Sequence, residues 1–166
     1  MRMRAPARGL VPLLASALLA LGCGGPPIDL KSGLQIDVVD TGWFDAGVVD
    51  GKNKLVPTVS FTVKNVSEQT LVTLQMMSSF FRVNDTNSEW GNGLLVVAGS
   101  AGLAPGATTP VLTMKSPLGY TGTEPRADML KNSHFIDAMV KLVAKYAATQ
   151  WTHVSEVPIE RKLITK

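Results

Sequence analysis

Cysteine and histidine are scarce in this sequence of 166 residues, which contains one cysteine and two histidines. A single cysteine cannot form a disulfide within the chain. Catalytic zinc takes three protein ligands, and His134 and His153 stand far apart with no other ligand at metal spacing. No serine stands in a Gly-x-Ser-x-Gly motif. We therefore expect no metal or cofactor, and a hydrolase is the least favoured function because no nucleophile, base and orienting group can be named as a set.

Long hydrophobic runs are also absent. The main apolar stretch, residues 10–21, is too short to span a bilayer comfortably. It follows Arg2, Arg4 and Arg8, with no acidic residue among them. A basic segment followed by a short apolar one is typical of a secretory signal peptide. We expect residues 1–22 to be removed and to play no part in the fold.

The single cysteine lies directly behind this apolar stretch, in the sequence Ala20-Leu21-Gly22-Cys23. A buried structural thiol is the less favoured alternative, because such cysteines sit among periodic apolar residues. The sequence resembles the lipobox of bacterial lipoproteins, in which small residues precede the cysteine that receives the lipid. The resemblance implies lipidation of Cys23 and a lipid-anchored protein on the periplasmic face of the cell envelope. Gly24 resembles the residue found there in lipoproteins of the outer membrane, where the cell has one.

An excess of positive charge is missing from the expected mature chain. The full sequence has a formal net charge of +3, from 16 basic and 13 acidic residues, and three arginines belong to the signal peptide. Without them the charges balance, so no basic excess remains to attract nucleic acid. We expect the partners to be the membrane, through the lipid, and an envelope protein, but not nucleic acid.

We expect the mature chain to consist of a short tether and one domain. Gly24 to Pro27 combine flexible glycines with stiff prolines, so we assign residues 23–32 to the lipidated cysteine and its tether. Residues 33–166 form the domain, because no internal repeat or second hydrophobic span divides them.

Alternation of apolar and polar residues dominates this domain. It is clearest at residues 58–64, where Val59, Phe61 and Val63 share one face, as in a half-buried strand. Polar residues 84–88 predict a loop. We predict further strands at residues 34–38, 72–80, 94–97, 109–114 and 157–163, a Pro-Gly turn at 103–106, and one short helix within 125–132.

Residues 135–146 fit two kinds of secondary structure. As a strand, the segment places Ala138 and Val140 inward; as a helix, it gives Lys141 and Lys145 a place on one polar stripe. Helix propensity favours the helix. The surrounding strands favour a strand, because a lone helix would need its own surface to cover. We favour the strand.

About seven strands separated by turns predict an all-β fold: an antiparallel β-sandwich with at most one short helix. The run Pro57 to Ser67, followed by the turn at 103–106 and a late strand that bears a tyrosine, resembles the immunoglobulin-like domains of FxLYD and CARDB type in bacterial envelope lipoproteins. The resemblance covers residues 34–165. It implies an immunoglobulin-like module with an adhesive or accessory role and no catalytic residue.

Aromatic residues are few, at 6% of the chain, and four of them lie near predicted loops: Trp43, Phe44, Trp90 and Trp151. Aromatic side chains at a surface carry much of the energy of protein and glycan recognition. Core packing is the commoner outcome, because aromatic side chains bury a large area. These four residues are the candidate binding surface.

One loop offers oxygen ligands of the type that calcium prefers, from Asp85, Asn87 and Glu89. It lacks the glycine and the distal glutamate of an EF-hand loop, so a solvated turn is the favoured interpretation.

The hypothesis favoured by these patterns is a non-enzymatic, membrane-anchored module that binds a protein partner or supports an assembly. Its contact surface would be an exposed sheet edge or the loop tryptophans. The alternative is a small-ligand, glycan or calcium-dependent binding domain.

Overall fold

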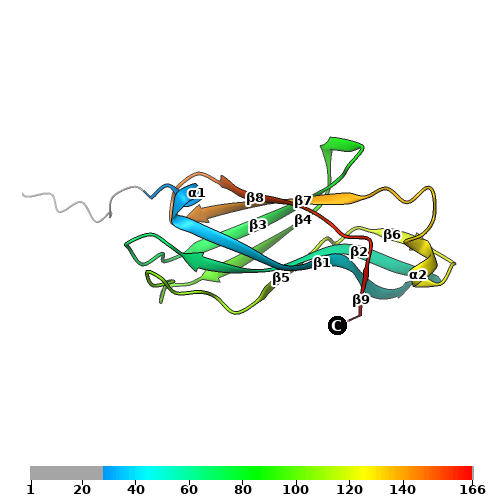
Figure 1. The fold of residues 1–166 in the computed structure, drawn as a ribbon, viewed down its shortest axis with the longest axis horizontal. Helices are drawn as coiled ribbons and strands as arrows, with labels where there is room; N and C mark the ends of the chain where they lie inside the picture. The colour runs from blue at the N-terminus through cyan, green and yellow to red at the C-terminus, as the bar shows by residue number, and fades with distance from the viewer. Residues whose placement is uncertain (1–27, 166) are drawn as a thin grey trace, which may run out of the picture.

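The structure is a computed structural model that describes residues 28–165 (Figure 1). The expected signal peptide and Cys23 lie outside the described residues, so cleavage and lipidation stay predictions.

Nine strands and two short helices make up the described part of the chain. The helices are α1 (Leu30–Gly33) and α2 (Arg126–Met129). The strands are β1 (Leu34–Val49), β2 (Lys52–Asn65), β3 (Leu74–Arg82), β4 (Asp85–Ala98), β5 (Leu112–Lys115), β6 (Tyr120–Gly122), β7 (Ala138–Tyr146), β8 (Thr152–Pro158) and β9 (Leu163–Ile164).

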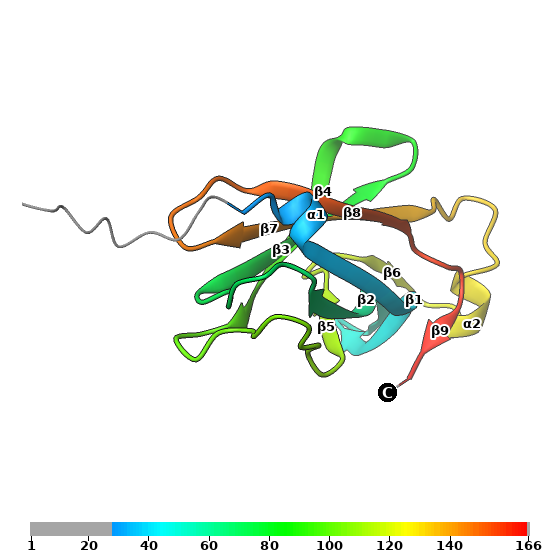
Figure 2. The ribbon, with the colours of Figure 1, turned by 60° about the vertical axis from the view of Figure 1, so that its left-hand side comes forward.

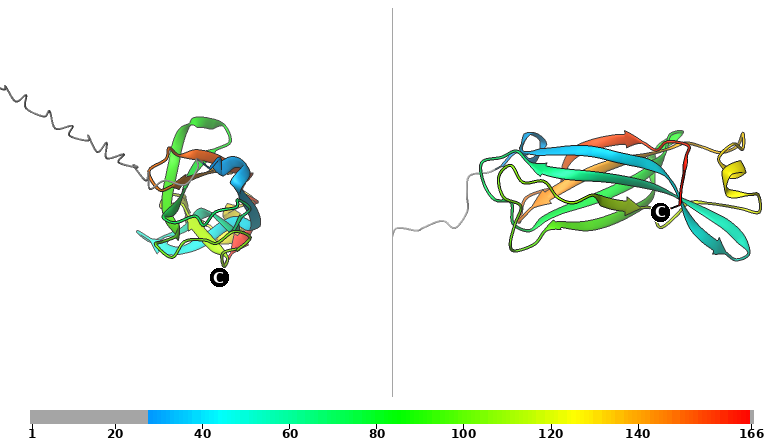
Figure 3. Two further views of the ribbon diagram at one scale, coloured as in Figure 1. Left: turned by 90° about the vertical axis from the view of Figure 1, so that its left-hand side faces the viewer. Right: turned by 60° about the horizontal axis from the view of Figure 1, so that its bottom comes forward.

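The strands form two sheets that pack face to face, as the end-on view in Figure 3 shows. The first sheet has the order β5-β2-β1-β9, with β6 also paired to β2, and the second has the order β4-β3-β7-β8. The pairing is antiparallel throughout except between β1 and β9, which is parallel. The fold is therefore an all-β sandwich, as the alternation predicts.

The core lies between the inner faces of the two sheets. Phe61 and Val63 of β2 face Phe80 of β3 and Val140 of β7 across it, and all four side chains are fully buried. Alternate residues of β7 are buried as the strand interpretation of residues 135–146 requires, so that interpretation is confirmed. The alternative helix interpretation of this segment is wrong, because β7 pairs on both sides, with β3 and β8, and its backbone hydrogen bonds lie within the sheet.

The hairpin of β1 and β2 runs the length of the sandwich, and its tip projects beyond the sheets (Figure 3). Asp50 and Gly51 form its turn with φ values of 50° and 73°. Two adjacent residues with positive φ are typical of the type I′ turn that Asp-Gly favours, because its twist matches that of the strands. The sequence predicts only the start of β1, because Val39 interrupts the alternation at a β-bulge between Val38 and Asp40.

Two further predictions, one turn and one short helix, are confirmed. Residues 104–107 form a turn closed by a hydrogen bond of 3.0 Å from the Ala107 N–H to the Ala104 carbonyl, and Gly106 has a φ of 74° there. A positive φ at the residue after proline is the type II geometry that glycine allows. The short helix predicted within 125–132 is α2, which begins directly after Pro125.

Other sequence-based boundaries are wrong. Residues 157–163 are not one strand, because β8 ends at Pro158 and β9 begins only at Leu163. The loop predicted at residues 84–88 belongs to β4, which starts at Asp85 and leaves the sheet as an exposed excursion before it rejoins β3. The strand count is also higher than seven, since β6 and β9 are too short to produce an alternating pattern.

A second helix, α1, was not predicted, and it closes one end of the sandwich next to β8 (Figure 2). Asp29 caps it by accepting a hydrogen bond of 3.0 Å from the Lys31 N–H. Leu30, which the sequence analysis assigns to the tether, is buried in the core. We call this end the α1 end, and the opposite end, with α2 and the tip of the β1–β2 hairpin, the α2 end.

We expect the substitution Phe61→Ala to lower the free energy of unfolding by about 3–5 kcal/mol, because it leaves a cavity in the centre of the core. Leu94→Ala is the matched control, since the Leu94 side chain is 64% exposed and its loss should change stability by less than about 0.5 kcal/mol. Urea denaturation measures both. Equal effects of the two substitutions would contradict this description of the core.

Candidate functional site

Four aromatic rings meet at the α2 end and connect the two sheets. Trp43 of β1 packs against Phe135 at 4.6 Å between ring centroids, against Tyr120 of β6 at 5.6 Å and against Trp90 of β4 at 5.9 Å. Tyr120 also contacts Trp90 and Phe135, at 5.0 and 4.6 Å. Tilted and edge-on rings at these separations are favourable. We call Trp43, Trp90, Tyr120 and Phe135 the aromatic cluster.

Polar contacts hold the outer part of this cluster in place. The Tyr120 hydroxyl accepts a hydrogen bond of 3.2 Å from the Ile136 N–H and donates one of 3.3 Å to the Ile136 carbonyl. Arg161 donates to the Phe135 carbonyl at 2.9 Å, and its guanidinium carbon lies 5.2 Å from the centre of the Phe135 ring. These contacts fix the segment between α2 and β7, which carries Phe135.

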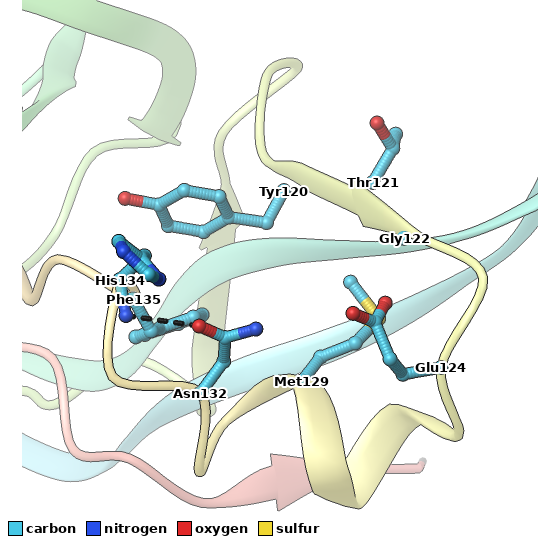
Figure 4. A pocket seen from close by; sticks show the side chains of 8 residues that line it. All are labelled: Tyr120, Thr121, Gly122, Glu124, Met129, Asn132, His134 and Phe135. Carbon is cyan, nitrogen blue, oxygen red and sulfur yellow. Dashed lines mark hydrogen bonds between the residues drawn. The ribbon is translucent and has the colours of Figure 1, made fainter.

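A cavity of about 200 Å³ opens beside the cluster (Figure 4). The rings of Tyr120, His134 and Phe135 lie on one side of it, and the Glu124 carboxylate lies over Met129 on the other. Asn132 completes the polar lining and accepts a hydrogen bond of 2.9 Å from the His134 N–H. The cavity therefore joins an apolar wall to one carboxylate, which is the composition of a small binding site.

Ion pairs surround this cavity. Arg126 of α2 lies 2.6 Å from Asp45 near the tip of the β1–β2 hairpin, and so joins the hairpin to α2. Lys131 lies 3.2 Å from Asp128. Arg161 lies 2.5 Å from Asp137, and this contact raises the pKa of Arg161 above its ordinary value.

The environment of Asp45 favours its charged form. The Gly47 N–H donates a hydrogen bond of 2.9 Å to the carboxylate, and the Arg126 guanidinium adds a second contact. Together they lower the pKa of Asp45 below its ordinary value and outweigh the opposing effect of partial burial.

Three loops place exposed apolar side chains at the α2 end. Val48 at the hairpin tip is 63% exposed, Val83 in the β3–β4 turn is 53% exposed, and Leu118 between β5 and β6 is 52% exposed. Leu118 borders a depression of about 170 Å³ that it shares with Arg82 and Trp90. Arg82 lies over the Trp90 ring, 5.0 Å from its centre.

The four predicted aromatic residues do not form one surface. Trp43 is fully buried, so its assignment to a binding surface is wrong and the core alternative holds for it. Trp90 is half-buried beside it. Phe44 points to the outer face of the first sheet, under the ammonium group of Lys115, where it lines a shallow groove of about 670 Å³. Trp151 is exposed before β8, with the ammonium group of Lys145 at 5.9 Å from the centre of its ring.

The predicted cation loop lies in the exposed excursion of β4. Asp85 and Glu89 border the depression that also contains the guanidinium of Arg82, and a positive charge there opposes the binding of a cation. Glu89 accepts a hydrogen bond from the Asn92 amide, and Asn87 is exposed. Within residues 28–165, no group of three or more histidine, cysteine or acidic residues could hold a metal ion. The geometry does not support calcium binding by these residues.

The two histidines lie on separate elements. His134 lines the cavity at the α2 end, whereas His153 lies in β8, with its imidazole 3.8 Å from the Glu156 carboxylate. The structure thus does not assemble the pair that a histidine-based hydrolase needs. Glu124, Tyr120 and Phe135 were not predicted as site residues. They lie within one stretch, residues 120–135, but no motif or regular alternation marks them there.

Comparisons with known proteins find no matching family profile and no matching curated protein. Solved structures do match, including one described as "X-ray structure of Northeast Structural Genomics Consortium target SoR45". That chain is similar over 80% of this chain and 86% of its own, with 14% sequence identity and a TM-score of 0.43. The class of the protein, an all-β sandwich, follows from its own strand pairing.

No helix in the described part of the chain is long and apolar enough to cross a membrane.

We expect Asp45→Asn to loosen the hairpin tip and to lower the free energy of unfolding at pH 7 by less than about 1 kcal/mol. A depressed pKa in the folded state stabilises the fold above the unfolded-state pKa of about 3.9, and this contribution disappears as the pH falls through the folded-state value. The variant should therefore lose less stability than the parent between pH 7 and pH 3.

Asp50→Asn is the matched control for this prediction, because Asn-Gly also favours a type I′ turn and the charge change is the same. Denaturation at both pH values measures the difference. Identical pH profiles for the two variants would show that the contacts of Asp45 contribute nothing.

Proposed function

We propose that this chain is a non-enzymatic module of the bacterial cell envelope, anchored by a lipid on Cys23, that binds a protein partner through its α2 end. The observation that carries the proposal is the exposure of apolar side chains on three loops in that half of the domain: Val48 at the hairpin tip, Val83 next to Arg82, and Leu118, which shares a depression with Arg82. Apolar side chains that gather at one exposed place are typical of interaction sites.

The position of the first described residues supports this orientation. Ile28 precedes α1, so the tether would leave the domain at the α1 end, and α2 and the tip of the β1–β2 hairpin would lie at the end opposite the anchor (Figure 1). The rigid aromatic cluster beneath the loops supports the same proposal, because binding loops held by a fixed framework lose less entropy on association.

The sequence also suggested an exposed sheet edge as the contact surface, and the second sheet has such an edge. Strand β4 forms that edge and exposes Leu94 and Val96. We favour the α2 end because its exposed apolar side chains come from three separate loops and because it also contains a cavity, whereas the edge offers one row.

A small-ligand binding domain is the second candidate function, and the cavity beside the aromatic cluster favours it. A volume of about 200 Å³ admits a group of several heavy atoms but not an oligosaccharide. The calcium-dependent version loses support because Arg82 lies among the oxygen ligands that it would use.

We expect Cys23→Ala to abolish incorporation of labelled palmitate and to release the chain from the membrane fraction, because the thiol is the proposed attachment site. Cell fractionation and metabolic labelling measure both effects. Serine in place of Cys23 should behave in the same way. Persistent labelling of either variant would refute the anchor.

We expect a photoreactive amino acid at Val48 or Leu118 to capture one envelope protein of constant mass in living cells, because both side chains lie in the proposed contact surface. Val66 is the control position: it is 45% exposed but follows β2 at the α1 end. Mass spectrometry of the adducts identifies the partner. Equal capture from Val66, or none from the α2 end, would count against this surface.

A further inference from the structure

We propose that the cavity at the α2 end binds an alkylammonium group. The group could belong to a lysine side chain of the protein partner or to a small free amine. In the first case the inference rests on the proposed function; in the second case it does not.

The described charged residues around the cavity leave one carboxylate unpaired. Four acidic residues lie on the elements that surround it: Asp45, Asp128, Asp137 and Glu124. Three of them have cationic partners, which are Arg126, Lys131 and Arg161. Among the residues that the structure describes, none forms an ion pair with Glu124. The cavity therefore contains one carboxylate whose charge is not neutralised by a neighbouring side chain.

The Glu124 carboxylate lies against the backbone at Gly122. A Cβ atom added at Gly122 would lie 2.5 Å from Oε2 of Glu124 and 3.4 Å from Cε of Met129. The carboxylate thus lies close over the backbone of β6, on the cavity side, as Figure 4 also shows. The absence of a side chain at Gly122 leaves room for it there.

The opposite wall of the cavity is aromatic. Tyr120 and Phe135 present aromatic rings to the cavity, 4.6 Å apart between centroids, and Met129 adds a thioether. Aromatic rings attract cations through the negative charge of their faces, and the methylene groups of an alkyl chain can pack on the same surface. A carboxylate on one side and rings on the other favour a cation with an apolar stem. An anion would be repelled by Glu124.

The size of the cavity limits the ligand. About 200 Å³ accommodates a primary ammonium group with a chain of four or five carbon atoms, but not an arginine-rich peptide or a sugar chain. A lysine side chain has this length, and its ammonium group donates three hydrogen bonds. Glu124 and Asn132 provide acceptor oxygens for them at the cavity wall.

The test uses n-butylammonium as the probe and the purified mature lipidated chain in detergent. We expect saturable chemical-shift changes at Tyr120, Glu124 and His134, and none with n-butanol, which has the same carbon chain without the charge. Glu124→Gln should weaken binding about two- to fivefold, because it removes the charge that pairs with the ammonium group at an exposed site. Gly122→Ala should also weaken binding, because the added methyl group displaces the carboxylate.

Glu68→Gln is the matched control, since Glu68 is an exposed glutamate beside α1 and its substitution removes the same charge from the other end. It should leave binding unchanged. Absence of binding by n-butylammonium, equal binding of butanol, or equal effects of the two glutamine substitutions would overturn the inference.

Crosslinking from Leu118 distinguishes the two sources of the ammonium group and separates this inference from the proposed function. If Glu124→Gln reduces partner capture, and excess n-butylammonium competes with it, the group is a lysine of the partner. If the amine binds but capture is unaffected, the cavity takes a free amine. If the amine does not bind while capture persists, the inference fails and the proposed function stands.

Discussion

The pairing of β1 with β2 is the constraint on which the rest of the sandwich depends. All other strands of the first sheet attach to this hairpin, because β5 and β6 pair with β2 and β9 pairs with β1. The register runs from Leu34 opposite Asn65 to Val49 opposite Lys52. It places Trp43 opposite Pro57, where the side chain turns inward and becomes the centre of the aromatic cluster. A register shift of one residue would turn Trp43 to the outer face and leave the α2 end without its core.

The cluster also determines how charge is distributed at the α2 end. Packing of Phe135 and Tyr120 against Trp43 fixes the connection between α2 and β7, and this connection brings Asp137 to Arg161. The hairpin tip brings Asp45 to Arg126 in the same way. Glu124 belongs to neither pair, because it follows β6 on the side where the chain offers no cation to it among the described residues. The unpaired carboxylate is thus a result of how the aromatic core is packed.

The layout of the sandwich could be predicted from the sequence where alternation was regular. Val59, Phe61 and Val63 identify β2, and the similar pattern around Val140 identifies β7. The pattern fails at β1, where a bulge at Val39 interrupts it, and at β9, where two residues cannot define a period. The exposed part of β4 could not be predicted either, because its residues are polar and belong to a strand only through their pairing with Arg82 and Phe81 of β3.

The candidate site was less predictable than the fold. The tryptophans could be selected from the sequence as candidates. The sequence does not show that Trp43 is buried and Trp151 exposed, because burial depends on where the fold places each residue. No motif marks Glu124 in the sequence, and its place beside Tyr120, Met129 and Phe135 depends on the path of the chain after β6.

The direction of β1 has a mechanical consequence. The strand starts at the α1 end and runs to the hairpin tip at the α2 end. A load between a membrane anchor at one end and a bound partner at the other would act along this strand. A load that leaves the domain through the loop of Leu118, between β5 and β6, would pass from β1 to β2 across hydrogen bonds that lie perpendicular to the strands. These bonds would be loaded in shear and would have to break together. Peeling, in contrast, breaks such bonds one at a time. If the anchor and the partner are as proposed, the domain would carry tension along its length through this sheet.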